Sequence, residues 1–255
     1  MLSVGSSDGE LVIFRIPKPI MSQDGISYPG TVQNVQQFSI QNVHDFSISC
    51  LKWSINGQKL FSGDKSGRIV ASVIDFFSNS VSSRVISSEN SEIVSLDYQM
   101  GILLVSTVTS TFAFSFKSDT ATQKIQIGQE GRQAGHYGSA FLQTGIGLSG
   151  LRFLVVRPDN KFWISNLKGD IEKTINLKDS VQNCHSEIPI INPSNIINDN
   201  SLPIAQIKVL SESRQEVIVW NFSSLHIVSL INDQVKRCMI LSDSWLLFGL
   251  LNIFH

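Results

Sequence analysis

The sharpest chemical motif in the sequence is Gly145-Ile146-Gly147-Leu148-Ser149-Gly150, which has the G-x-G-x-x-G spacing of a dinucleotide-binding loop. Such a loop lies between a strand and a helix, because the helix N-terminus receives the pyrophosphate. Here the apolar segment 151–157 follows and stops at Pro158, which is typical of a strand. We therefore interpret these glycines as a turn and assign no cofactor to them.

Histidine and cysteine are the next candidates for chemistry. His44 could serve as a base or ligand, but it precedes an alternating strand, and we expect it to hydrogen-bond within its own sheet. Cys184 and His185 adjoin, yet a metal site needs several converging ligands, and the other cysteines, Cys50 and Cys238, are far away in sequence. Three cysteines without a C-x-x-C pair predict a reducing compartment, with a cytoplasmic location as the default.

The acidic residues show no catalytic pattern. Most of them stand where a turn is expected and their side chains bond the local backbone: Asp8, Asp64, Asp159, Asp170 and Asp233. Nothing in the sequence points to a glycosidase carboxylate pair, and it contains no Gly-x-Ser-x-Gly elbow or Walker loop. The sequon at Asn221 lies within a predicted strand and is discounted. We assign no catalytic, cofactor-binding or metal-binding residue, and no partner-binding residue is identified.

Composition and charge narrow the class of protein to which this chain can belong. The chain has 255 residues, is 42% apolar, and carries a formal net charge of −1 with 20 scattered basic residues, which argues against a nucleic-acid or anionic membrane surface. The longest apolar run, residues 245–254, is about half the length that spans a bilayer. The start of the chain has no signal-peptide pattern.

Residues 44–74 hold the element that must position any site. They read as three β-strands with a two-residue period, separated by turns at Ser54-Ile55-Asn56-Gly57 and Asp64-Lys65-Ser66-Gly67. Strand starts recur near residues 48, 92, 137 and 205, and the first three give a period of roughly 45 residues, as expected for four-stranded propeller blades. The sequence therefore predicts an all-β propeller.

The predicted blades follow one another along the chain. The first blade opens at its second strand, and residues 17–30 are expected to form a loop within it. We place the blades at residues 2–40, 44–87, 92–128, 137–177 and 204–233, with a partial blade at 234–255 and a mobile insertion at 178–203. The count of about five to six blades is below the seven common in such rings, so the single domain is expected to be an incomplete propeller.

The residues that carry a family resemblance begin with His44, Trp53-Ser54-Ile55-Asn56-Gly57 and the segment from Leu60 to Ile69. This order resembles the WD repeat, in which a loop His, a strand Ser, a hairpin Asp and a closing Trp form a buried hydrogen-bond chain. Ser66 replaces that Asp and Ser72 replaces that Trp, so we expect the chain to be incomplete here.

A more specific resemblance covers residues 1 to about 177. The phrases that carry it are Leu60-Phe61-Ser62-Gly63-Asp64, Ile93-Val94-Ser95-Leu96-Asp97-Tyr98, Leu103-Leu104-Val105-Ser106-Thr107, Ile127-Gly128, Tyr137-Gly138-Ser139-Ala140-Phe141 and Arg157-Pro158, with Trp163 and Gly169 in register. They resemble the N-terminal WD-repeat propeller of the tectonin β-propeller repeat-containing protein 2 family, and a related propeller opens the Hermansky–Pudlak syndrome protein five family.

The resemblance implies a non-enzymatic scaffold that binds other proteins of membrane traffic or autophagy. The second family implies a subunit of a complex for the biogenesis of lysosome-related organelles, and we keep this as an alternative. A propeller enzyme or sugar-binding module with a site in the central channel is the other alternative. Converging acidic or His side chains in the channel would indicate that chemistry, whereas small polar or apolar ones would indicate a scaffold.

Overall fold

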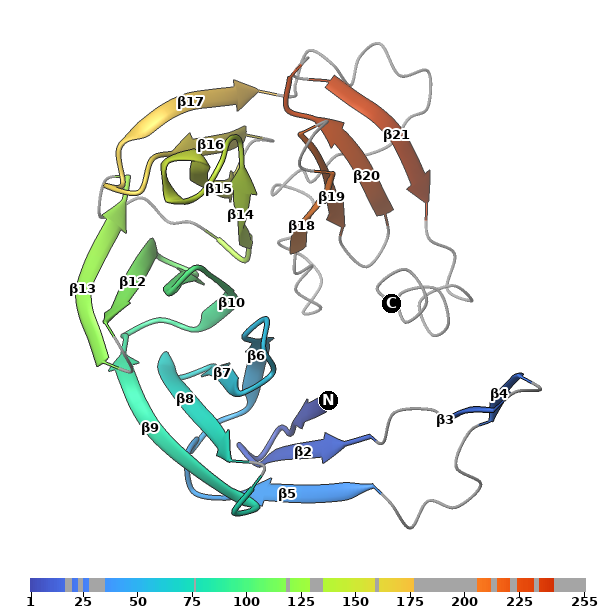
Figure 1. Ribbon diagram of the computed structural model, residues 1–255. Coiled ribbons are helices and arrows are strands. Elements are labelled where there is room, and N and C mark those ends of the chain that lie inside the picture. Colours follow the sequence, from blue (N-terminus) through green and yellow to red (C-terminus); the bar gives the residue numbers. More distant parts are fainter. Residues whose placement is uncertain are drawn as a thin grey trace. The chain divides into compact units, whose positions relative to one another are not determined.

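The computed structural model describes residues 1–16, 20–22, 25–27, 35–75, 77–117, 120–128, 135–158, 161–176, 206–211, 215–220, 224–231 and 234–240. Within these ranges the structure is antiparallel β-sheet with one short 3₁₀ helix, η2 (Leu148–Gly150). The chain divides into two compact units, residues 1–93 and 94–255. Figure 1 draws the strands, coloured along the sequence. No described helical segment has the length and hydropathy needed to cross a membrane.

The first unit contains two of the predicted blades. Blade one is a three-stranded sheet in the order β1-β2-β5, from β1 (Leu2–Gly5), β2 (Leu11–Arg15) and β5 (Gln36–Ile40). Blade two is four-stranded in sequence order, from β6 (Ile48–Trp53), β7 (Lys59–Asp64), β8 (Arg68–Asp75) and β9 (Ser80–Ser88). The three strands expected in residues 44–74 are therefore confirmed.

One prediction within the first unit is wrong. Residues 17–30 were expected to form only a loop, but β3 (Ile20–Ser22) pairs with β4 (Gly25–Ser27) in a two-stranded hairpin. Each strand has three residues, which is too short for a two-residue period to be recognised in the sequence.

The second unit contains three four-stranded sheets, each in sequence order. Blade three consists of β10 (Ile93–Gln99), which starts at the boundary of the two units, β11 (Ile102–Thr107), β12 (Thr111–Lys117) and β13 (Thr120–Ile127). Blade four consists of β14 (Ser139–Gln143), β15 (Leu151–Arg157), β16 (Lys161–Ser165) and β17 (Ile171–Asn176). Blade five consists of β18 (Gln206–Ser211), β19 (Glu216–Trp220), β20 (Ser224–Ser229) and β21 (Gln234–Ile240).

The end of the chain requires a second correction. Residues 234–255 were predicted to begin a partial sixth blade, but β21 pairs antiparallel with β20 and completes blade five as its fourth strand. The sequence does not reveal this, because a fourth strand and a new first strand have the same alternation. The predicted insertion at 178–203 and residues 241–255 lie outside the described residues.

Three turns share one local structure. In each, a side-chain oxygen of the first residue accepts hydrogen bonds from the backbone N–H groups two and four residues later, which satisfies donors that the strands leave unpaired. The accepting residues are Ser6, Asp64 and Asn166, and the paired donors are Asp8 and Glu10, Ser66 and Arg68, and Lys168 and Asp170. The fourth residue is a glycine with positive φ in every case: Gly9, Gly67 and Gly169.

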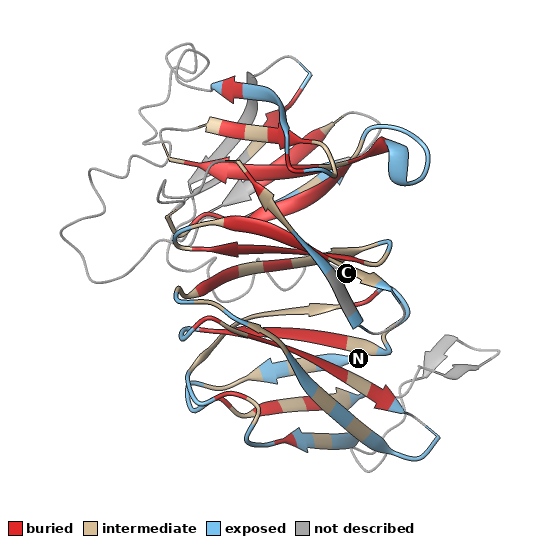
Figure 2. Cartoon of the chain, turned by 90° about the vertical axis from the view of Figure 1, so that its left-hand side faces the viewer, coloured by how far each residue is buried: buried red, intermediate tan, exposed pale blue. Residues whose placement is uncertain are grey.

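Each unit has its own apolar core (Figure 2). In the first unit, Leu11, Ile13 and Leu60 are fully buried in one cluster. In the second unit, β15 contributes to two clusters, since Phe153 lies on one face of the strand and Leu154 on the other. Strands that are buried on both faces hold each sheet against its neighbours in the same unit.

Candidate functional site

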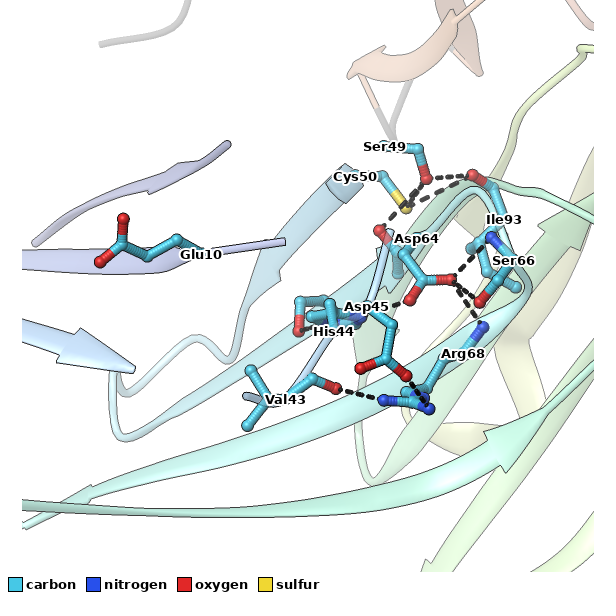
Figure 3. Close-up of polar contacts among 12 residues, drawn as sticks. Glu10, Val43, His44, Asp45, Ser49, Cys50, Asp64, Ser66, Arg68 and Ile93 are labelled. Carbon is cyan, nitrogen blue, oxygen red and sulfur yellow. Dashed lines mark hydrogen bonds and ion pairs between the residues drawn. The ribbon is translucent and has the colours of Figure 1, made fainter. Parts of the chain in front are cut away.

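His44 lies between two buried side chains of β7. Its Nδ1 is 2.8 Å from Asp64 Oδ2 (Figure 3). Its Nε2 is 2.7 Å from Ser62 Oγ. The side chains of His44 and Asp64 have no exposed surface, and Ser62 is fully buried as well. The expectation that His44 bonds within its own sheet is confirmed.

Asp64 also organises the turn that follows β7. Its Oδ1 accepts hydrogen bonds from Ser66 N at 2.9 Å, Ser66 Oγ at 2.7 Å and Arg68 N at 2.9 Å. Desolvation acts to raise the pKa of Asp64, but the hydrogen bonds from Ser66, His44 and Arg68 outweigh it and hold the pKa below its ordinary value. Asp64 is therefore held as a carboxylate at neutral pH.

Arg68 ties the same turn to the loop before β6. Its Nη2 lies 2.5 Å from Asp45 Oδ2, and its Nη1 donates to the carbonyl oxygen of Val43 at 3.2 Å (Figure 3). The loop that carries His44 is thus fixed on both sides of the histidine.

This geometry corrects one part of the expectation of an incomplete hydrogen-bond chain, namely the missing acid. Asp64 supplies the carboxylate that was expected at position 66, and Ser66 now donates to it, so the two residue types have exchanged places within one turn. The closing Trp is absent, as expected. Ser72 occupies its position and shares a hydrogen bond with Ser83 at 2.8 Å. The His-Ser-Asp part of the chain is complete.

A Ser-His-Asp arrangement with these distances resembles a hydrolytic triad, in which the His activates the Ser hydroxyl. A nucleophile must reach a substrate, however, and Ser62 has no exposed surface. Ser62 lies in the middle of β7, where neighbouring strands cover it on both sides. The three side chains therefore hold the loop before β6 against strand β7.

A serine of β6, the first strand of blade two, also bonds the backbone of neighbouring segments. Ser49 Oγ donates to the carbonyl oxygens of Ile93 at 2.5 Å and Gly63 at 3.1 Å. Beside it, desolvation raises the pKa of the Cys50 thiol to about 12. Cys50 is therefore a protonated, poorly nucleophilic thiol at neutral pH.

Large apolar side chains are exposed at one end of blade two. Ile55 is 89% exposed in the turn between β6 and β7, and Phe77 is fully exposed in the turn between β8 and β9. In an antiparallel four-stranded sheet these two turns fall at the same end. The opposite end has the polar turn built on Asp64.

The second unit shows the same arrangement in blades three and four. Met100, between β10 and β11, is half-exposed, and Ile146, between β14 and β15, is 95% exposed. β10 and β14 run side by side in the same direction, since Ser95 Oγ accepts from Ser139 N and Asp97 Oδ2 accepts from Phe141 N. The two apolar turns therefore lie at the same end of this unit.

The loop that carries Ile146 is held rigidly by its own hydrogen bonds. Gln143 Nε2 donates to Gly147 O at 2.9 Å, and Thr144 N donates to Gly150 O at 2.8 Å. The turn predicted from the glycine motif is confirmed, because η2 and then β15 follow it rather than an α-helix. The sequence reading missed the exposed Ile146, for which the only signal was an apolar residue between turn glycines.

The other candidate residues have local roles or lie outside the described residues. Asp170 Oδ2 accepts from Asn166 Nδ2 at 3.1 Å, and Asp8 Oδ1 accepts from Ser7 Oγ at 3.3 Å. These bonds are made to side chains of the same turn, whereas bonds to the local backbone were expected. The residues outside are Asp159, Cys184, His185, Asn221 and Asp233. Within the described ranges no three His, Cys, Asp or Glu side chains form a group that could hold a metal ion.

Two known proteins are similar to this chain in sequence. No family model matches the chain. The chain is 29% identical over 241 residues to Tectonin beta-propeller repeat-containing protein 2 of Homo sapiens, which covers 91% of this chain and 16% of that protein. It is 31% identical over 197 residues to WD repeat-containing protein CG11141 of Drosophila melanogaster, which covers 76% of this chain and 28% of that protein. The chain thus spans less than a third of the length of either relative.

Two solved structures have a fold similar to that of this chain. The WD40 β-propeller domain of Doa1 aligns with a TM-score of 0.56 at 12% identity, over 92% of this chain and 63% of that chain. Saccharomyces cerevisiae Sqt1 aligns with a TM-score of 0.61 at 12% identity, over 95% of this chain and 60% of that chain. The described sheets are therefore blades of a WD40-type β-propeller, and the sequence relatives support a WD-repeat and tectonin-type propeller.

Proposed function

We propose that this chain is a non-enzymatic scaffold that binds other proteins through the exposed apolar turns of its blades. The observation that carries the proposal is the exposure of Ile55, Phe77 and Ile146 on turns whose backbones are held by hydrogen bonds. Apolar side chains presented on rigid turns lose little conformational entropy when a partner covers them. The Ser-His-Asp group, by contrast, is buried and serves the fold.

The partners in this proposal are proteins of membrane traffic or autophagy, encountered in the cytoplasm. The 29% identity to Tectonin beta-propeller repeat-containing protein 2 supports this part of the proposal, since the resemblance to that family implies a role in these processes. The shared segment is the propeller, so the proposal concerns what the propeller binds.

The test is affinity capture from cytosolic extract with the immobilised chain, followed by mass spectrometry. Ile146→Asp, and separately Ile55→Asp combined with Phe77→Asp, place a charge on each apolar turn. Because these side chains are exposed, the variants should unfold at the wild-type temperature while losing captured proteins. We expect at least one set of trafficking or autophagy proteins to disappear in one of the variants.

The matched control is Lys65→Glu, which changes an exposed side chain on the polar turn at the other end of blade two. It should capture the same proteins as the wild type. Capture that is identical in all the variants, or no specific capture by the wild type, would contradict the proposed function.

A further inference from the structure

A cavity of about 670 Å³ lies within the second unit, between the end of β13 and the hairpin formed by β16 and β17. Its lining consists of Gln126 and Gly128 from blade three and Trp163, Lys168, Gly169, Asp170, Ile171 and Thr174 from blade four. The Asp170 carboxylate accepts a hydrogen bond from Asn166 Nδ2 at 3.1 Å within its own turn. The volume lies in the range of pockets that bind small ligands or side chains of a peptide. No part of the Ser-His-Asp group contributes to it.

Trp163 is held in place by the protein on two sides. Its ring packs so closely on Gly128 that a Cβ at Gly128 would clash with it, and the Arg157 guanidinium lies 4.4 Å from the ring centroid. The indole is therefore oriented before any ligand arrives. Gly128 has a φ of 73°, which favours glycine, so both its conformation and the space around it exclude a larger residue.

Two hydrogen-bond donors at this cavity lack a protein acceptor. Trp163 Nε1–H and the Lys168 ammonium make no hydrogen bond or ion pair among the residues that the structure describes. Trp163 is partly exposed and Lys168 is exposed, so a ligand can reach both side chains. A carboxylate is the common side-chain group that accepts from an indole N–H and a lysine at the same time.

The neighbouring strand offers a way to deliver that carboxylate. β17 pairs only with β16 among the described strands, and most of its residues are exposed. An extended peptide that adds to such an edge directs alternate side chains to the same face of the sheet. Ile171 and Thr174 of β17 face the cavity, so alternate side chains of an added strand would enter it.

We propose that this cavity binds an acidic side chain from an extended segment of a partner protein that pairs with β17. The inference rests on the proposed scaffold function and adds to it a site and a class of partner segment. Trp163 and Lys168 would hold the carboxylate, and Ile171 would contact the neighbouring aliphatic part of the segment.

The test is fluorescence anisotropy with labelled peptides of alternating glutamate and valine, flanked by glycine and serine. Matched peptides replace glutamate by glutamine or lysine. We expect the glutamate peptide to bind at least about tenfold more tightly than the glutamine peptide, and its affinity to fall with rising salt. The whole chain is used throughout.

Variants separate the two donors. Lys168→Glu should weaken binding of the glutamate peptide by about tenfold or more, because it replaces attraction by repulsion. Trp163→Phe keeps a ring on Gly128 and Arg157 but removes the N–H, and it should weaken binding by about fivefold. Lys65→Glu makes the same charge change on the first unit and should bind like the wild type.

Equal affinity for the glutamate and glutamine peptides, or equal effects of Lys168→Glu and Lys65→Glu, would overturn the assignment. Affinity capture distinguishes this failure from failure of the scaffold function. If Lys168→Glu captures the same proteins as the wild type, the cavity is not the site and the scaffold function stands. If Lys168→Glu loses proteins that Lys65→Glu retains, the cavity assignment is supported.

Discussion

Blades two and three close the hairpin between their second and third strands in different ways. In blade two, the turn after β7 starts with Asp64, whose buried carboxylate also binds His44 from a loop twenty residues earlier in the sequence. In blade three, the turn after β11 starts with Thr107, whose hydroxyl accepts from Thr109 N at 3.2 Å and Ser110 N at 2.9 Å. A turn of this kind needs only a side-chain oxygen at its first position.

The difference shows what the histidine adds. The second strand of blade three is largely apolar and buried along its whole length, and its long-range side-chain hydrogen bond joins Ser106 Oγ to Ser139 Oγ of β14 at 2.7 Å rather than to a loop. Blade two has a Gly-Asp pair at the same place, and the His44 bonds hold the loop before β6 on the sheet. The buried polar chain is therefore a stabilising addition to a blade, and breaking it should cost more than breaking the turn in blade three.

The largest effect is expected for Asp64→Ala. It leaves His44 and two backbone N–H groups without their acceptor in a buried region, and we expect the free energy of unfolding to fall by about 3 kcal/mol. Thr107→Ala in blade three should lower it by about 1 kcal/mol, because only turn hydrogen bonds are lost. Urea unfolding of both variants checks the comparison, which fails if Thr107→Ala is the more damaging.

Gly67→Ala should cause the next largest loss of free energy of unfolding. Gly67 has a φ of 99°, and a Cβ there would clash with the carbonyl oxygens of Glu89 and Ser91, so we expect a loss of about 2 kcal/mol or more. Gly57→Ala is the matched control, since Gly57 has a φ of 67° and the nearest atom to an added Cβ is Met1 Cγ at 4.0 Å, so only backbone strain of about 1 kcal/mol remains. Thermal unfolding should give this order, and equal losses would show that the backbone contact does not matter.

His44→Ala should cost about 2 kcal/mol, one increment of about 1 kcal/mol for each of its two hydrogen bonds. Affinity capture by the folded variant should be unchanged, because His44 is buried away from the apolar turns. A variant of wild-type stability that no longer captures partners would make His44 a binding residue and would contradict the structural role.

The pH dependence of stability should distinguish Asp64 from its neutral analogue. The pKa of Asp64 is lowered in the folded state, so its contribution is complete above the unfolded value of about 3.9 and is lost as the pH falls through the folded pKa. Asp64→Asn should therefore be less stable than the wild type at pH 7, with a gap that narrows below about pH 4. A gap of constant size from pH 7 to pH 2 would rule out this linkage.

The smallest effect concerns Cys50. Near neutral pH we expect its burial to change the reactivity of the thiol and not the stability of the protein. The thiol pKa of about 12 means that, in a Cys184→Ser and Cys238→Ser background, Cys50 should react with iodoacetamide at pH 8 much more slowly in the folded protein than in urea. Because the folded pKa is raised, any stability linked to this thiol is present below pH 9 and declines as the pH rises toward 12. Equal alkylation rates in the folded and unfolded protein would contradict the burial of the thiol.

The sequence by itself determined the blades and most of their turns. Strand starts predicted near residues 48, 92, 137 and 205 are observed at Ile48, Ile93, Ser139 and Gln206. The turn at residues 145–150 was also recognised correctly. These features are local, because a two-residue alternation and a few turn residues specify them within one stretch of chain.

Tertiary structure alone decided which distant atoms meet. The WD-repeat consensus placed the hairpin acid at position 66, and only the packing of the His44 loop on β7 shows that Asp64 fills that role. In the same way, the cavity at Trp163 exists because Gly128 of another blade lies against the indole. Such contacts depend on strand register and on the packing of one sheet against the next, and a local pattern of residues encodes neither.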